Sequence, residues 1–188
     1  MSVGIMDFKS TVAALTATVM ISLPMVVSAE SRADSLLQEL QGAEDATAAD
    51  RLERQIIDEW SKSGSPAMDL LLKRGQNALE VKKHAEAAEH FRALTDHAPD
   101  FAEGWHGLAL AYFQANRFGP AMDALERTLA INPHHFAALR GVGAVHEQTG
   151  HPALAYEAYE RVLELRPHDE DVLQALGRLE ATVKGIKL

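Results

Sequence analysis

The stretch Ala102–His135 reads AEGWHGLALAYFQANRFGPAMDALERTLAINPHH and contains two amphipathic segments joined by a turn signal at residues 116–119. Pro120 can begin the second segment as a helix, because a proline at the first helical position loses no hydrogen bond. The stretch closes with Asn132 and Pro133, where the proline disfavours helical geometry in the residue before it. Four side chains of the first segment are spaced to share one helix face: Trp105, Leu108, Ala109 and Tyr112. The stretch therefore predicts two helices packed as a hairpin.

The same pattern recurs along the chain with a step of 34 residues. Pro99, Pro133 and Pro167 keep this step. Small and large apolar side chains keep it too: Ala87, Ala121 and Ala155, and Phe91, Leu125 and Tyr159. A fixed period of this size indicates a stack of helical hairpins, none of which can bury its apolar face alone. Three units fit the period, and they span residues 68–101, 102–135 and 136–169.

These units resemble the tetratricopeptide repeat, which places a large residue, Leu, Gly or Ala, Tyr, Ala, Phe, Ala and Pro at fixed positions. The second unit matches this pattern at seven positions: Trp105, Leu108, Ala109, Tyr112, Ala121, Leu125 and Pro133. Arg74 departs from it where the first unit should have Leu, and Thr128 departs at the second Ala position. The resemblance implies an all-α fold, a right-handed α-solenoid of three stacked helix-turn-helix units.

Helical patterns also flank the three units. Residues 170–188 are expected to form a capping helix that covers the last apolar face of the stack. Residues 30–67 predict a helical hairpin and a joint, which is either a cap or a degenerate repeat. Glu53 would fall where a repeat has Ala at the closest helix approach, so we favour the cap.

The first 29 residues have the features of a secretory signal peptide. Lys9 precedes an apolar run over residues 11–27, and Val27-Ser28-Ala29 offers small residues before a cleavage point. We therefore expect export across the inner membrane and a periplasmic location. The alternative is an uncleaved membrane anchor, for which the run is at the short limit.

Composition excludes several classes of function. The chain has 188 residues, no cysteine and a formal net charge of −9. Thiolate catalysis, disulfides and cysteine zinc sites are excluded. No basic face is expected, so we predict no nucleic-acid partner, and after signal cleavage we predict no membrane contact.

No catalytic or cofactor motif stands out in the repeat region. Residues 68–188 contain no serine, and Gly141 and Gly143 lie within a helical pattern with no strand before them. None of the nine histidines pairs with another at the i, i+3 or i, i+4 spacing of a helical metal site. We therefore predict no catalytic residue, no cofactor and no metal.

The resemblance also implies a concave surface formed by the first helix of each unit. The residues that this carries over as partner contacts are Leu72, Gln76, Leu79, His106, Leu110, Phe113, Gln114, Arg140, Gln148 and, on the capping helix, Arg178. The family's clamp for chaperone C-terminal carboxylates uses Lys and Asn where this chain has Leu72 and Gln76, so that activity is not expected.

The expected groove is apolar in one part and cationic in another. It suggests a partner segment that is apolar at one end and acidic at the other. The alternative is that the N-terminal hairpin covers the groove, with Trp60 lying across Leu72, Leu79 and Phe113.

The function that follows is a non-catalytic adaptor or scaffold that holds another protein in the cell envelope. One alternative is a self-assembling protein that forms a homodimer through its terminal hairpins. A second is an enzyme that uses the repeats as a scaffold, for which we find no catalytic cluster.

Overall fold

The structure is a computed structural model, and it describes Met1 and residues 31–186. The expected signal peptide, residues 1–29, lies outside the described residues except for Met1. In the described part, no helix has the length and apolarity needed to cross a membrane.

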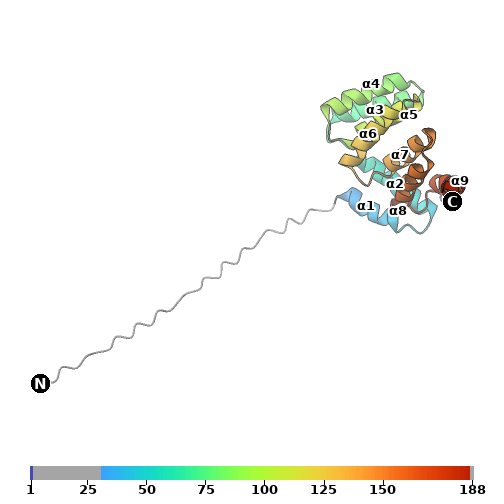
Figure 1. Cartoon of the computed structure of the whole chain (residues 1–188). Coiled ribbons are helices and arrows are strands. Elements are labelled where there is room, and N and C mark those ends of the chain that lie inside the picture. Colours follow the sequence, from blue (N-terminus) through green and yellow to red (C-terminus); the bar gives the residue numbers. More distant parts are fainter. Residues whose placement is uncertain (2–30, 187–188) are drawn as a thin grey trace.

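All regular elements of the described residues are α-helices, which confirms the all-α solenoid (Figure 1). In chain order they are α1 (Arg32–Gln41), α2 (Ala46–Trp60), α3 (Pro66–Glu80), α4 (His84–His97), α5 (Ala102–Gln114), α6 (Phe118–Ile131), α7 (Phe136–Gln148), α8 (Pro152–Leu165) and α9 (Glu170–Ile186). The pairs α3–α4, α5–α6 and α7–α8 pack as hairpins, and α9 packs on α8.

The turn inside each hairpin uses one residue in the left-handed region. These residues are Lys82, Asn116 and Gly150, and they keep the 34-residue step. Glycine adopts this conformation freely and asparagine tolerates it, whereas a lysine there is strained. The three turns therefore have the same backbone, although their sequences differ.

Small residues on the first helix of a unit allow the helices to approach closely. A Cβ added to Gly75 or Gly107 would lie 2.5 Å or 2.3 Å from the Phe91 ring, and one added to Gly143 would lie 2.4 Å from the Tyr159 ring. The ring of Phe91 thus occupies space that a side chain would fill on both α3 and α5. This contact joins the first unit to the second.

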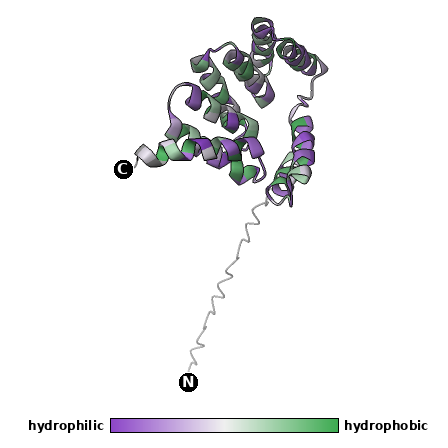
Figure 2. Ribbon diagram, turned by 90° about the vertical axis from the view of Figure 1, so that its right-hand side faces the viewer, coloured by the Kyte–Doolittle hydropathy of each residue, from purple (hydrophilic) through white to green (hydrophobic). Residues whose placement is uncertain are grey.

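The N-terminal hairpin does not stack on the first unit as a preceding cap would. The described core divides into two clusters, and the hairpin residues Leu40, Ala49 and Ile56 share theirs with α7, α8 and α9. In Figure 2 the hairpin, next to the grey trace, stands on the side toward which the arc of the other helices opens. The hairpin therefore packs on the third unit and α9 from the side of the inner face.

This placement explains Arg74, the departure from the family pattern in α3. The equivalent residues of the next units are the buried Leu108 and the half-buried Val142, whereas Arg74 is exposed. Because no helix of the hairpin packs on that edge of α3, a charged side chain there stays in water. The outer edge of the first unit is therefore polar at Arg74 and needs no covering helix there.

Candidate functional site

The inner face of the array has an apolar cavity between α5 and α7. Its volume is about 230 Å³, and we call it the central cavity. Its lining residues are His106, Ala109, Leu110, Phe113, Leu125, Ala137, Arg140, Gly141 and Ala144. A Cβ added to Gly141 would lie 2.8 Å from the side chain of Leu125, so this glycine keeps the leucine accessible to the cavity. Arg140 and His106 supply the polar groups of an otherwise apolar wall.

A second, smaller cavity adjoins the first toward α3. Its volume is about 140 Å³, we call it the α3 cavity, and it shares His106, Leu110 and Ala137 with the central cavity. Leu72, Gln76 and Leu79 form its α3 side, and Ile57 of α2 closes it. The remaining lining residues are Phe91, Glu103, Gly107 and His135. The two cavities therefore form a continuous apolar trough, and Ile57 of α2 borders it only at the α3 end.

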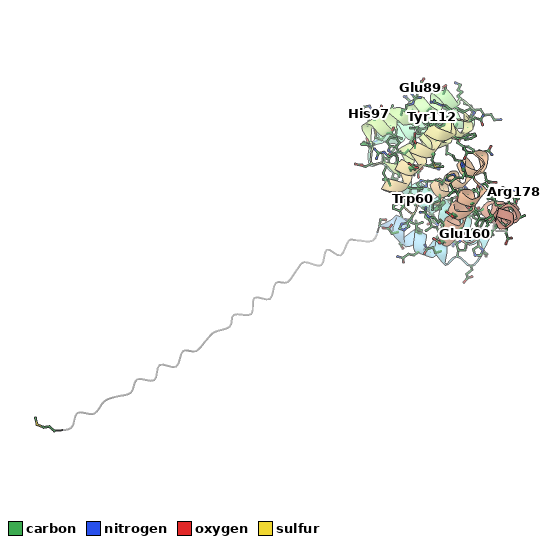
Figure 3. All side chains as sticks on the ribbon, in the orientation of Figure 1. Trp60, Glu89, His97, Tyr112, Glu160 and Arg178 are labelled. Atoms are coloured by element: carbon green, nitrogen blue, oxygen red, sulfur yellow. The ribbon has the colours of Figure 1, made fainter. Side chains whose placement is uncertain are left out.

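The structure brings together seven of the ten predicted contact residues: Leu72, Gln76, Leu79, His106, Leu110, Phe113 and Arg140. Gln114, Gln148 and Arg178 line neither cavity. Arg178 lies on α9 at the far end of the array and reaches Glu147 at 3.5 Å (Figure 3). The two cavities thus span only part of the surface that the ten predicted contact residues would cover.

The hairpin borders the inner face only beside α3, and it does so with Ile57 and not with Trp60 as the alternative stated. Trp60 does not belong to the cluster of Leu72 and Phe113; its ring stacks on His135 at 4.7 Å and 26° and contacts Phe136 at 5.2 Å. Ile57, one turn earlier, is the residue that faces Leu72 across the α3 cavity. The central cavity has no hairpin residue in its lining.

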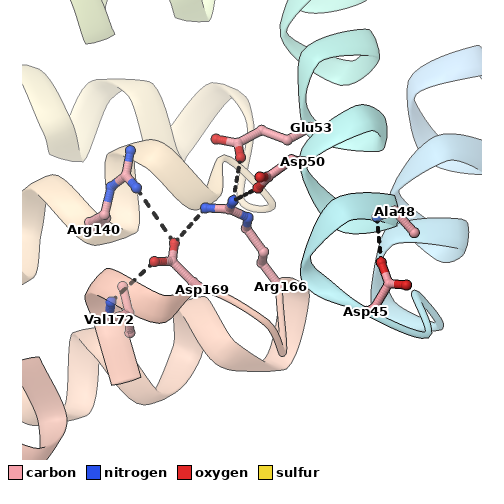
Figure 4. Close-up of polar contacts among 8 residues, drawn as sticks. All are labelled: Asp45, Ala48, Asp50, Glu53, Arg140, Arg166, Asp169 and Val172. Atoms are coloured by element: carbon pink, nitrogen blue, oxygen red, sulfur yellow. Dashed lines mark hydrogen bonds and ion pairs between the residues drawn. The ribbon is translucent and has the colours of Figure 1, made fainter. Parts of the chain in front are cut away.

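A network of ion pairs fixes α2 to the end of α8 (Figure 4). The guanidinium of Arg166 lies 2.6 Å from Asp50, 2.7 Å from Glu53 and 2.9 Å from Asp169. Asp169 also accepts a hydrogen bond from the Val172 backbone N–H, which caps α9. Burial raises the pKa of the Glu53 carboxyl, although the positive charges of Arg166 and Arg140 oppose this.

Arg140 stands between this network and the central cavity. Its guanidinium reaches Asp169 at 3.5 Å, and 39% of its side chain is exposed. From the sequence we expected Arg140 to bind an acidic group of a partner. In the structure Asp169 of the same chain occupies part of that role. The contact is long, so guanidinium donors remain available at the edge of the cavity.

Three potential metal ligands meet at the base of the α3 cavity. Glu103 lies 2.9 Å from His135 Nε2 and 3.7 Å from His106 Nδ1, and the three ligand atoms lie within 4.8 Å of one another. Burial alone would raise the pKa of Glu103, but hydrogen bonds with His106 and His135 outweigh it and hold that pKa at about 2. Burial lowers the pKa of His135, so the group is a carboxylate beside a neutral imidazole.

This cluster was not predicted, because its two histidines do not share a helix. The sequence feature that could have indicated a metal site is Glu103 with His106 at the i, i+3 spacing, together with His135 almost one repeat later. Ile57 and Gly141 were not predicted as site residues either. The family's contact positions do not indicate where α2 lies, and they do not show that a glycine leaves space for a cavity.

The comparisons with known proteins agree on the repeat. Two family models, each described as tetratricopeptide repeat, match residues 72–134 and 108–180. A TPR repeat-containing protein of Rhizobium etli is 31% identical over 127 residues, which are 68% of this chain. The match spans 62% of that relative's length.

Several solved structures share the fold. The first TPR of Spaghetti (RPAP3), bound to an HSP90 peptide, has a TM-score of 0.61 at 24% identity and covers 62% of this chain and 93% of its own. MamA has a TM-score of 0.60 at 23% identity, with 82% and 85% covered. At these identities the likeness concerns the fold.

Proposed function

The chain is a member of the tetratricopeptide-repeat family, and from this premise we propose that it is a non-catalytic adaptor that holds a segment of a partner protein in its central cavity. The observation that carries the proposal is that this cavity is apolar, lies on the inner face and is lined by no residue of the hairpin. An apolar hollow of this kind suits a large side chain from another protein.

Structural neighbours support this mode of binding. The first TPR of Spaghetti (RPAP3) is bound to the HSP90 peptide SRMEEVD, and the second TPR domain of human RPAP3 is in complex with the HSP70 peptide SGPTIEEVD. In this chain Leu72 and Gln76 replace the Lys and Asn of the chaperone clamp, and Ile57 closes the trough beside them. We therefore propose a different partner, anchored between α5 and α7.

The lining of the cavity defines the chemistry of the partner segment. Leu110, Phe113 and Leu125 favour a leucine, methionine or aromatic side chain, whose burial contributes about 1.5–3 kcal/mol. The free donors of Arg140 favour an acidic group next to that side chain. The segment is thus an apolar anchor with an adjacent carboxylate.

Site-specific photocrosslinking in cells tests this proposal. A photoreactive residue at the exposed Gln114, which follows the cavity residue Phe113 on α5, should capture one partner, while the same residue at Glu89 on the exposed side of α4 should not (Figure 3). The segment of the captured protein is then made as a peptide, and its dissociation constant is measured by calorimetry.

The variants Phe113→Ala and Arg140→Gln should each weaken the binding of this peptide by about tenfold, which is 1.4 kcal/mol. The matched control is Arg161→Gln, which removes one charge from the exposed side of α8 and should leave the dissociation constant unchanged. Equal affinity in all three variants would contradict the assignment of the central cavity.

The location in the cell envelope is proposed from residues 1–29 alone. It predicts that the purified protein from its native host begins near Glu30 and is released with the periplasmic fraction. Recovery of a chain that begins at Met1 or Ser2 would overturn it.

A further inference from the structure

The cluster of Glu103, His106 and His135 brings two imidazoles and one carboxylate to one point. Glu103 and His106 lie one turn apart on α5, and His135 precedes α7. All three line the α3 cavity, and their side chains are 8%, 15% and 2% exposed. Two nitrogen ligands and one carboxylate oxygen match the donor set that Zn²⁺ prefers in sites with an open coordination position.

We propose that these three residues bind one Zn²⁺ ion, with the fourth coordination position directed into the α3 cavity. Glu103 Oε1 lies 2.9 Å from His135 Nε2 and Glu103 Oε2 lies 3.7 Å from His106 Nδ1, and one ligand atom from each residue lies within 4.8 Å of the other two. Ligand atoms around a tetrahedral ion with bonds of about 2.0–2.1 Å are about 3.3–3.4 Å apart, so the three groups have to draw together around the ion. A small shift of His106, the most exposed of the three, completes the geometry.

The surroundings hold the ligands in place. The Trp60 ring stacks on His135 from the α2 side, and the rings of His106 and His135 lie 4.5 Å apart. His135 is held from two more elements, by its bond to Glu103 of α5 and by the first turn of α7. Ligands that are oriented before the ion arrives lose little conformational entropy on binding.

The hydrogen bonds of His135 set the cost of binding. In the metal-free protein Nδ1 accepts a hydrogen bond from the Ala138 backbone N–H at 3.1 Å, so Nε2 carries the ring proton and donates a hydrogen bond to Glu103. An ion on Nε2 displaces that proton to Nδ1 and breaks the cap. The Ala138 N–H keeps its bond to the His135 carbonyl at 2.9 Å, so no backbone donor is left unpaired. After the exchange the Nδ1–H faces the Ala138 N–H, which is also a donor, so this step opposes binding and limits the affinity of the site.

Calorimetric titration of the full, untagged chain with ZnCl₂ after treatment with a chelator tests the proposal. One ion should bind per chain, and His106→Ala should weaken its binding by more than about tenfold. His106 is partly exposed, so this variant should keep the helical circular dichroism of the parent. The matched control is His151→Ala, which removes an exposed histidine that contacts His146 in the turn before α8.

A second readout distinguishes this site from adventitious binding. In protein labelled with ¹⁵N at histidine, Zn²⁺ should move the His135 proton from Nε2 to Nδ1, which the ring nitrogen shifts report directly. Absence of binding would overturn the proposal. Binding that His106→Ala leaves unchanged, or that leaves the His135 tautomer unchanged, would overturn it as well. None of these results depends on the partner of the central cavity.

Discussion

Phe91 shows how single residues set the spacing of this array. Its ring lies against Gly75 on one helix and Gly107 on another, and it is fully buried. A side chain at either glycine would overlap the ring, so the ring or the helix that carries the new side chain would have to move. Gly75 occupies a small-residue position of the family pattern, but Gly107 does not, so the sequence does not indicate that one ring fills both spaces.

Gly107→Ala should therefore lower the free energy of unfolding by about 1–3 kcal/mol, because the added methyl group forces the Phe91 ring or α5 to shift. The matched control is Gly177→Ala in α9, where an added Cβ meets nothing within 4 Å. That variant should gain up to about 1 kcal/mol from helix propensity. Urea titrations of both variants check this, and an equal effect of the two changes would contradict it.

Acid should destabilise the metal-free protein through the Glu103–His135 pair. Both pKa values are lowered in the folded state, from 4.5 to about 2 for Glu103 and from 6.5 for His135. As the pH falls, the unfolded chain therefore takes up these protons before the folded chain does. The stabilisation is fully present above pH 6.5 and is lost on acidification, at up to about 1.4 kcal/mol per pH unit for each group.

The variant His135→Asn isolates the histidine contribution to this pH dependence. Asparagine can still accept the Ala138 N–H at the start of α7, but it does not titrate. In the presence of a chelator, the loss of stability between pH 6.5 and 5 should be smaller in this variant than in the parent. The same slope in both proteins would show that His135 is not the group responsible.

At the scale of elements, one arginine joins α2, α8 and α9. Arg166 is buried, and it contacts Asp50 and Glu53 on α2 and Asp169 at the start of α9. In the sequence Glu53 stands at a position where a repeat unit has Ala. The structure explains this carboxylate by its ion pair with Arg166 at the end of α8.

Arg166→Met should lower the free energy of unfolding by about 3–5 kcal/mol, since it leaves the buried carboxylate of Asp169 and the half-buried carboxylate of Glu53 without their main partner. Asp50→Asn should cost less than about 1 kcal/mol, because the Asp50 side chain is 52% exposed and water replaces its contact. Denaturant midpoints of the two variants measure the difference. Similar losses would mean that burial does not determine the strength of this network.

The sequence predicts those helices whose contacts recur in every repeat unit. The helices from α3 to α8 meet their neighbours through the same positions in every unit, so the 34-residue step indicates both the helices and their order. The hairpin α1–α2 makes its long-range contacts once, such as Ala43 with His168. A stripe of leucines predicts that a helix is covered, but it does not specify by which helix. Arg74, which departs from the family pattern, lies on the edge of α3 that the hairpin leaves exposed.

At the scale of the whole molecule, the position of the hairpin changes the shape of the candidate binding surface. The resemblance implies an open trough along three first helices, but α2 closes the part beside α3 with Ile57. The chain also directs its own Glu53 and Asp169 toward Arg140, so part of the expected cationic surface is neutralised internally. What is left for a partner is the central cavity, between α5 and α7.

The two core clusters divide the molecule differently from its sequence order. One joins α1 and α2 to the third unit and α9, and the other joins the first and second units and also includes Ala138 and Val145 of α7. We therefore expect two cooperative regions in native-state hydrogen exchange, with the hairpin protected together with α8 and α9, more than 90 residues away along the chain.

Leu40→Ala and Leu94→Ala test this division, since both leucines are fully buried, one in each cluster. Each change should cost about 2–5 kcal/mol. Leu40→Ala should speed amide exchange in α8 and α9 more than in α3 and α4, and Leu94→Ala should do the reverse. Exchange that rises only in α1 and α2 with Leu40→Ala would mean that the hairpin is not integrated with the third unit. A uniform rise with either variant would mean that the array unfolds as one unit in spite of its two cores.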